Sequence, residues 1–383
     1  MENHHVCLRF QKDFFASFFL GKKEDTQKKT IYDFFHHLQQ GIFMNYVLLG
    51  NSGLRVSELC LGTMTFGEEW GWGASKKESK KMYTAYRKAG GNFIDTANFY
   101  TEGTSEKIVG ELIAHERESI VLATKYTLTM KKGDPNWSGN HRKNLTQSLE
   151  ASLKRLKTDY IDLYWVHAWD FMTPVEEVLR ALDDAVRQGK ILYIGISDTP
   201  AWKVAQANTI AELRGWSSFI GLQIEYSLVE RTVERELLPM AQELNLGVLA
   251  WSPLGAGVLS GKFSTKEKNT ATRLKKGSEK LNKHNIEIAD EVISIAKEIG
   301  CTPAQVALRW LRAQNAIPML GARNEIQLKD NLACLNISIT PQHLERLDSI
   351  SKIDLGFPHN FLKRKSIREI VYSGVYDKIE KRK

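Results

Sequence analysis

The hydrophobic pattern from residue 57 onward alternates short apolar runs with longer amphipathic stretches. Eight runs are apolar at nearly every position, which is typical of strands covered on both faces. These runs span residues 59–62, 92–96, 120–125, 161–167, 191–197, 220–226, 247–252 and 317–321. The stretches between them have helical spacing, as at Leu145, Leu149, Leu153 and Leu156, which share one helical face. Eight strands alternating with helices predict a (β/α)8 TIM barrel of the α/β class.

Thr-Pro pairs mark four of the expected helix starts, with a capping hydroxyl before a proline at the first helical position. The pairs are Thr173–Pro174, Thr199–Pro200, Thr302–Pro303 and Thr340–Pro341. Thr173 with Glu176 also fits a capping box, and Gly189 stands where that helix should end.

Residues 1–43 mix Phe-rich and Lys-rich pieces without a steady period, unlike the rest of the chain. We therefore treat residues 1–43 as an atypical N-terminal extension, dispensable or disordered, and residues 44–383 as the barrel domain with a C-terminal tail. Met44 is then a candidate alternative start. Apolar residues at 46–49 and 54–56 flank an Asn/Gly-rich turn at 50–53, which predicts a β-hairpin.

A doubly wound sheet is the rival fold, but it usually carries a Gly-rich turn after its first strand. No such turn follows residues 59–62. The segment that begins Gly255-Ala256-Gly257 has Ser260 where the third glycine of GxGxxG belongs, and Phe263 stands where a P-loop needs Ser or Thr. The barrel is therefore favoured.

Composition places the chain among ordinary globular proteins. Of its 383 residues, 42% are hydrophobic and 26% are charged, and the net charge of +8 comes with basic clusters in both tails. We see no basic element in the body that would bind nucleic acid, no apolar run approaching the ~20 residues of a membrane span, and no secretory signal. We expect a cytoplasmic protein without a metal site. Four scattered cysteines are expected to be free, buried thiols: Cys7, Cys60, Cys301 and Cys334.

Four polar side chains lie at or just after the C-terminal ends of three successive predicted strands. Asp95 lies near the end of the second run and Tyr100 just after it, Lys125 closes the third and His167 closes the fourth. In a parallel barrel these strand ends point to one face, so the four side chains should meet.

A phenol, an ammonium, a carboxylate and an imidazole together form a plausible proton donor for a carbonyl. Free tyrosine has a pKa of ~10, and a neighbouring ammonium stabilises the phenolate and lowers that pKa. Lys125 can supply this charge, Asp95 can hold Lys125 protonated, and His167 can orient a substrate oxygen. Each residue alone has an ordinary structural explanation, but the four together favour acid–base catalysis of carbonyl reduction.

The chain resembles the aldo-keto reductase family over residues 46–340. The matching motifs are Gly62-Thr63-Met64, residues 93–100, Ala123-Thr124-Lys125 and Trp165-Val166-His167. The resemblance implies a barrel whose N-terminal hairpin closes the bottom. It also implies Tyr100 as general acid, Lys125 and Asp95 as its tuners, and His167 as the residue that orients the carbonyl.

The same resemblance implies NADPH/NADP+ bound across the barrel mouth. Ser197 and Gln223 match residues that hold the nicotinamide amide, whereas Asp198 stands where many relatives carry Asn or Arg. Trp251 matches the residue that stacks on the nicotinamide. The full set of implied cofactor residues is Gly62, Thr63, Met64, Asp95, Ser197, Asp198, Gln223, Trp251, Ser252, Pro253, Leu254, Gly255, Gly257, Lys262, Gly321, Arg323, Gln327, Asp330 and Asn331.

Physical reasoning agrees with a phosphorylated cofactor. Small residues at Gly255 and Gly257 allow backbone N–H groups to approach phosphate, and Lys262 adds a positive charge. A helix beginning near Asn324 would direct its N-terminus at a phosphate, and Arg323 can bind a 2′-phosphate with both arms of its guanidinium. We therefore expect NADP rather than NAD.

The expected substrate is a small carbonyl compound or alcohol. Aromatic residues on loops at the open face favour aromatic or apolar aldehydes and ketones, and residues 356–361 resemble the tail of the aryl-alcohol dehydrogenase-like branch. These aromatic residues are Phe66, Trp70, Trp72, Phe99, Trp137 and Trp169. The alternative is a regulatory subunit like the potassium-channel β subunit, which binds NADP(H) with little turnover, but that branch carries Asn where His167 stands. The oligomeric state is left open.

Overall fold

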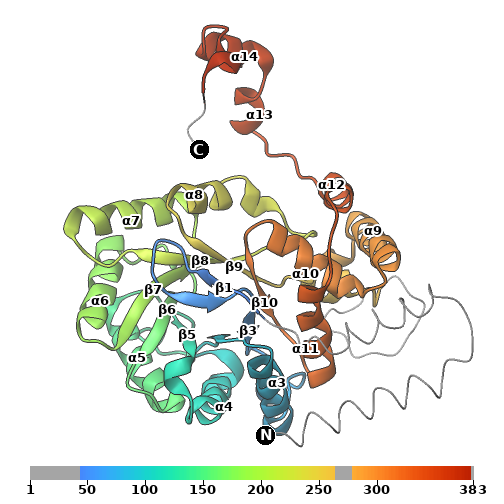
Figure 1. The fold of residues 1–383 in the computed structure, drawn as a ribbon. Helices are drawn as coiled ribbons and strands as arrows, with labels where there is room; N and C mark the ends of the chain where they lie inside the picture. The colour runs from blue at the N-terminus through green and yellow to red at the C-terminus, as the bar shows by residue number, and fades with distance from the viewer. Residues whose placement is uncertain (1–43, 264–277, 381–383) are drawn as a thin grey trace, which may run out of the picture. The chain divides into compact units, whose positions relative to one another are not determined.

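The computed structural model describes residues 44–263 and 278–380 (Figure 1). The predicted extension at residues 1–43 lies outside the described residues, as does Cys7.

Eight parallel strands form a closed barrel in the order β10-β3-β4-β5-β6-β7-β8-β9. All eight predicted strands are therefore confirmed, and the fold is the predicted (β/α)8 barrel. The strands are β3 Cys60–Gly62, β4 Phe93–Asp95, β5 Val121–Tyr126, β6 Ile161–Val166, β7 Ile191–Ser197, β8 Phe219–Glu225, β9 Gly247–Trp251 and β10 Ile317–Leu320.

Helices connect the strands and surround the barrel (Figure 1). The α-helices are α3 Lys76–Lys88, α4 Thr104–Ile113, α5 Arg142–Leu156, α6 Val175–Arg187, α7 Ala201–Arg214, α8 Leu237–Glu243, α9 Lys283–Ile299, α10 Pro303–Ala313, α11 Glu325–Leu332, α12 Pro341–Ile350, α13 His359–Leu362 and α14 Lys365–Val371. Short 3-10 helices lie between them: η1 Tyr100–Gly103, η2 Arg117–Ser119, η3 Thr232–Glu234, η4 Gly255–Ser260, η5 Glu279–Leu281, η6 Ala333–Asn336 and η7 Tyr376–Lys378. The predicted apolar face of α5 is buried at all four leucines.

Two of the four predicted Thr-Pro caps are confirmed. Thr302 and Thr340 cap α10 and α12, each with proline in the first helical turn. At α6 and α7 the prediction is wrong, because the proline itself has extended backbone and the helix begins one residue later. The two threonine hydroxyls donate to residues that precede them in the chain instead of capping the helix. Thr173 Oγ1 donates to Asp170 Oδ2 at 2.7 Å, and Thr199 Oγ1 donates to the Ser197 carbonyl at 2.7 Å. Thr173 is therefore not part of a capping box, whereas Gly189 follows the end of α6 with φ 71° as expected.

The predicted hairpin is present and closes one end of the barrel. Strands β1 (Tyr46–Leu48) and β2 (Arg55–Ser57) pair antiparallel, and Leu49 and Val56 pack in one cluster with side chains of the barrel interior. The hairpin backbone at Gly50 lies close to the barrel, because a Cβ at this position would be 2.1 Å from the Ile220 carbonyl oxygen. Only glycine fits this position, which also has φ +56°.

Trp165 on β6 fills the barrel interior and is fully buried. A Cβ at Gly195 on the neighbouring strand β7 would lie 2.3 Å from its ring, and a Cβ at Gly221 on β8 would lie 2.9 Å from it. Glycines on two strands therefore leave the space that the indole occupies. The interior is thus packed with side chains, and the site must lie at a barrel end.

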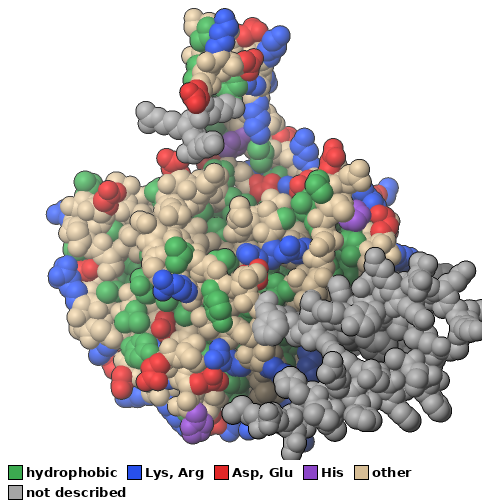
Figure 2. Space-filling view, in the orientation of Figure 1, with side chains coloured by type: hydrophobic (Ala, Val, Ile, Leu, Met, Phe, Trp, Pro, Cys, Tyr) green, Lys and Arg blue, Asp and Glu red, His purple; other side chains and the backbone are tan. Residues whose placement is uncertain are grey.

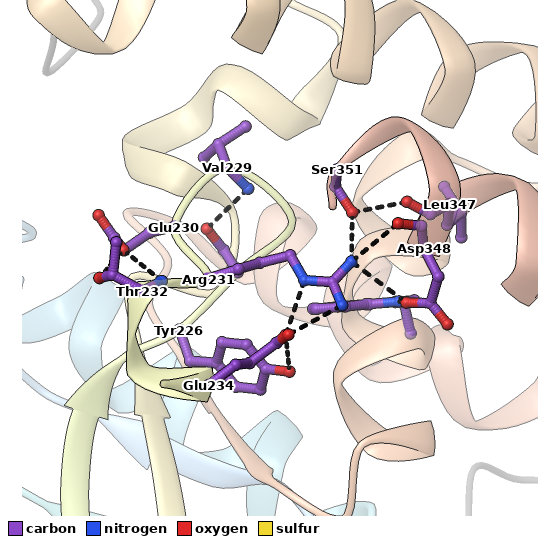
Figure 3. A network of polar contacts seen from close by, with 11 residues as sticks. Tyr226, Val229, Glu230, Arg231, Thr232, Glu234, Leu347, Asp348 and Ser351 are labelled. Atoms are coloured by element: carbon purple, nitrogen blue, oxygen red, sulfur yellow. Dashed lines mark hydrogen bonds and ion pairs between the residues drawn. The ribbon is translucent and has the colours of Figure 1, made fainter. Parts of the chain in front are cut away.

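A polar network ties the segment after β8 to helix α12 (Figure 3). The buried Arg231 donates to Glu234 Oε1 at 2.7 Å and to Ser351 Oγ at 2.7 Å. Tyr226 at the end of β8 donates to the same Glu234 oxygen at 2.8 Å. Because these bonds involve charged groups shielded from water, they should hold α12 firmly against the barrel.

The surface carries Lys and Arg side chains interspersed with Asp and Glu on the face drawn in Figure 2. The C-terminal segment exposes several apolar residues, including Phe357, Leu362 and Ile370. Among the described residues, no helix is long and apolar enough to cross a membrane. Cys60 and Cys334 are free and buried, as predicted, whereas Cys301 is free but only half-buried.

Candidate active site

The structure brings the four predicted catalytic side chains together at the C-terminal ends of the strands. The Lys125 ammonium forms an ion pair with Asp95 and lies 3.2 Å from the Tyr100 hydroxyl oxygen. The ring of His167 meets that of Tyr100 edge-on, with centroids 5.9 Å apart. Two left-handed residues after Tyr100, Thr101 and Glu102, turn the chain into α4. The predicted convergence is therefore confirmed.

Asp95 and Lys125 form a buried ion pair, since both side chains are completely inaccessible to water. Burial raises the pKa of Asp95 above its usual value, and Lys125 and a bond from Gln223 Nε2 at 3.0 Å offset part of that effect. Burial opposes the charge on Lys125 as well, but the nearby Asp95 and Tyr100 outweigh it and raise the pKa of Lys125. Lys125 also donates to the Thr96 carbonyl at 2.8 Å, so the ammonium is held by three oxygen atoms.

The pKa of Tyr100 departs from the sequence prediction. Burial raises this pKa above the usual value of tyrosine, and the charge of Lys125 offsets only part of the rise. The sequence reveals the neighbouring cation but not the extent of burial, which is the larger effect. The phenol is therefore protonated at neutral pH, the state that a proton donor requires.

His167 is neutral at neutral pH. Burial, followed by the charge of Lys125, moves the pKa of its imidazole well below the usual value. Its Nδ1 is buried and has no hydrogen-bond partner among the described residues, and the side chain lines the cavity described below. The imidazole can therefore present a hydrogen-bonding nitrogen to a ligand.

The buried neutral imidazole predicts acid-sensitive stability. Below the usual histidine pKa of 6.5 the unfolded chain takes up a proton at this position that the folded protein does not, so stability falls as the pH decreases until the folded pKa is reached. When the pH falls from 7.5 to 5.5, the free energy of unfolding, measured with urea, should decrease by about 1.4 kcal/mol more in wild type than in His167→Gln. His115→Gln, at an exposed histidine, is the matched control and should follow wild type. Equal losses in wild type and His167→Gln would contradict the assignment.

A cavity of about 780 Å³ opens beside the four side chains. Sixteen of the residues predicted to bind a cofactor line it: Gly62, Met64, Ser197, Asp198, Gln223, Trp251, Ser252, Pro253, Leu254, Gly257, Lys262, Gly321, Arg323, Gln327, Asp330 and Asn331. The other three do not line it. Asp95 and Thr63 are fully buried, with Thr63 Oγ1 donating to the Asp95 carbonyl at 3.0 Å, and Gly255 packs toward Val229.

Sequence reasoning missed part of the cavity wall. Residues from the loops and from α10 contribute to it without having been assigned to the cofactor. They include Thr65, Leu128, Phe263, Thr302, Ala304 and Leu308. The Thr302–Pro303 pair was recognised only as a helix start, although both residues also face the cavity.

The predicted anion site at the start of α11 is partly occupied by the protein itself. Asn324 caps the helix by accepting from the Gln327 amide at 2.9 Å, as predicted for a helix beginning there. However, the Glu325 amide donates to Glu78 on α3 at 2.8 Å, and the Arg323 amide donates to Gln327 Oε1 at 3.0 Å. The backbone of this turn is thus less available to a phosphate than the sequence suggested.

Three of the six predicted aromatic residues form a wall of the cavity. Trp70 lies with its ring centroid 5.7 Å from that of Trp72 and 5.7 Å from that of Phe99, and all three line the cavity. Phe66 is buried in packing, and neither Trp137 nor Trp169 lines the cavity. The aromatic surface is therefore smaller than predicted. Among residues 44–263 and 278–380, no group of His, Cys, Asp and Glu is arranged to hold a metal ion.

The fold is a closed parallel barrel with acid–base side chains at one end, and comparison with known proteins gives the family. Residues 58–352 match the aldo/keto reductase family. The chain belongs to this family.

Its relatives include oxidoreductases named for aryl alcohols. It is 39% identical over 328 residues to norsolorinic acid reductase of Aspergillus flavus, covering 82% of this chain and 83% of the relative. The chain is 36% identical over 327 residues to an aryl-alcohol dehydrogenase of Pestalotiopsis microspora, and the alignment covers 82% of this chain and 84% of the relative. The chain is 34% identical over 353 residues to aryl-alcohol dehydrogenase [NADP(+)] of Phanerodontia chrysosporium, and the alignment covers 85% of this chain and 91% of the relative.

Proposed function

We propose that this oxidoreductase reduces aldehydes or ketones, aromatic or apolar in character, to alcohols with NADPH. One observation carries the proposal. Tyr100 lines the cavity, and its hydroxyl oxygen lies 3.2 Å from the buried ammonium of Lys125. A protonated phenol at this position can give its proton to a carbonyl oxygen. Oxidation of the alcohol follows the same path in reverse.

The residues of the cavity fit a nicotinamide dinucleotide. Ser197 lines the cavity with its hydroxyl buried, and a ligand amide can bond to that hydroxyl. At Gly257, with φ +101°, a Cβ would meet no atom closer than 3.9 Å, which leaves room for a phosphate beside the backbone. Lys262 and Arg323 add positive charge to the same cavity. When bound, the reduced cofactor supplies the hydride.

The protein's own residues perform the proton chemistry. Tyr100 donates the proton to the substrate oxygen, and Lys125 stabilises the phenolate that remains. Asp95 keeps Lys125 charged and in place. The neutral His167 donates a hydrogen bond to the same substrate oxygen and orients the carbonyl.

The preference for an aromatic or apolar substrate rests on the wall formed by Trp70, Trp72 and Phe99. Flat rings can pack against these side chains at the usual separations of aromatic pairs. The relatives named aryl-alcohol dehydrogenase agree with this choice.

A panel of aromatic, aliphatic and sugar aldehydes tests the proposal, with NADPH consumption as the readout. We expect the highest kcat/KM for aromatic aldehydes. A chain that binds NADPH tightly but turns over no carbonyl compound would contradict the proposal and favour the regulatory alternative.

Arg323 should select NADPH over NADH. Arg323 lines the cavity, and a charge-assisted bond to a 2′-phosphate contributes about 1.5–3 kcal/mol. Arg323→Ala should therefore weaken NADPH binding about 10- to 100-fold while leaving NADH binding nearly unchanged, measured by calorimetric titration. Equal losses for both nucleotides would refute a contact with the 2′-phosphate.

A further inference from the structure

Asp198 is the residue that the proposed mechanism leaves without a role. It follows strand β7 directly and lines the cavity next to Ser197. Its backbone is left-handed, with φ 40°, a conformation that Asp and Asn tolerate better than most residues. The local chain is anchored, because the Asp198 carbonyl accepts from the Trp169 amide at 3.4 Å.

The Asp198 carboxylate contacts the side chain of Trp251 at the end of β9, and β8 lies between β7 and β9 in the barrel. Trp251 Nε1 donates to Asp198 Oδ1 at 3.1 Å, and both residues line the cavity. Burial raises the pKa of Asp198, while the bond from Trp251 and the charge of Lys125 act in the opposite direction. The carboxylate and the indole thus form one wall of the cavity.

The charged groups around this wall differ in their ion-pair partners. Asp95 and Lys125 neutralise each other, and His167 is neutral. Glu225, at the end of β8, is paired with Lys280. Among the cavity-lining residues that the structure describes, the remaining charged groups are Asp198, Lys262, Arg323 and Asp330.

The other three charged groups have different partners or roles. Lys262 and Arg323 are assigned above to phosphate groups. Asp330 accepts from Gln305 at 2.8 Å and Thr302 at 3.1 Å, on the side of α10 and α11. Asp198 is therefore a cavity-lining carboxylate close to the catalytic residues that forms no ion pair with any of the residues the structure describes.

A fixed anion distinguishes the two redox states of a nicotinamide. The oxidised ring carries a positive charge and the reduced ring is neutral, so a fixed carboxylate attracts only the oxidised form. At the effective dielectric constant of about 20 that suits protein sites, a charge several ångströms away changes such a binding ratio on the order of tenfold or more. Hydrogen bonding alone would act on both states similarly.

We propose that Asp198 stabilises the bound oxidised cofactor relative to the reduced one, which makes bound NADPH a stronger hydride donor and favours carbonyl reduction, relative to a neutral residue at this position. This inference rests on the nicotinamide cofactor of the proposed function. Trp251 serves as the positioning residue that fixes the carboxylate, through its indole N–H.

The test is the ratio of two dissociation constants, Kd for NADP+ divided by Kd for NADPH, measured by isothermal titration calorimetry at low salt and pH 7.5. Asp198→Asn retains an oxygen that accepts from Trp251 and tolerates the left-handed backbone, but it removes the charge. The ratio should rise about tenfold, which corresponds to a shift of about 30 mV in the potential of the bound two-electron couple. Asp134→Asn, at a half-buried loop carboxylate that is paired with Lys131 and does not line the cavity, is the matched control and should leave the ratio unchanged.

The possible outcomes separate this inference from the proposed function. If both nucleotides bind wild type and the ratio in Asp198→Asn changes less than twofold, the charge has no such effect and the inference is wrong. The same holds if both affinities fall equally, which would indicate a purely structural role. If neither nucleotide binds wild type, the proposed cofactor and this inference fail together.

Discussion

Tyr100→Phe should lower the turnover of an aromatic aldehyde by about 10²–10⁴-fold while leaving NADPH binding intact. The substitution removes only the hydroxyl that lies 3.2 Å from the Lys125 ammonium, and the ring keeps its edge-on packing against His167. Without the hydroxyl, no side chain at this position can protonate the substrate oxygen. Steady-state rates and calorimetric titration with NADPH measure the two effects separately.

Tyr126→Phe provides the matched control for the loss of a buried hydroxyl. The Tyr126 hydroxyl donates to the Asn140 carbonyl at 3.1 Å and its side chain does not line the cavity, so this variant should lose some stability but retain turnover. Near-normal turnover in Tyr100→Phe would contradict the role assigned to Tyr100.

Lys125→Met should destabilise the fold by about 3–5 kcal/mol, measured by urea unfolding at pH 7. The substitution leaves the fully buried Asp95 carboxylate without its cation, and burial already raises the pKa of that carboxyl. The double variant Lys125→Met/Asp95→Asn should regain part of the loss, because it no longer buries an unpaired charge.

Lys131→Met is the matched control at an exposed ion pair with Asp134, and it should change stability by less than about 1 kcal/mol. If Lys125→Met lowered the free energy of unfolding as little as this control does, the buried Asp95–Lys125 pair would not stabilise the fold as the geometry indicates.

The barrel and the convergence of the four side chains were predictable because they depend on local patterns. Continuous apolar runs identify buried parallel strands, and Asp95, Lys125 and His167 close or directly follow three of them. In a closed parallel barrel such positions meet whatever the details of packing.

Other features depend on contacts that local sequence does not encode. Asp170 captures the Thr173 hydroxyl, so α6 begins later than its Thr-Pro pair suggests. Glu78 lies 247 positions from Glu325 yet accepts from its amide, which the pattern near Asn324 cannot reveal. The direction of the Tyr100 pKa shift is likewise decided by burial, which depends on the whole fold.

The most direct test of the account is isotope transfer from NADPH deuterated at the reactive C4 position of the nicotinamide to an aromatic aldehyde. The account predicts that wild type yields an alcohol carrying one deuterium on its carbinol carbon, detected by mass spectrometry, and that Tyr100→Phe yields almost none. An alcohol without deuterium, or equal labelled product from both proteins, would contradict it.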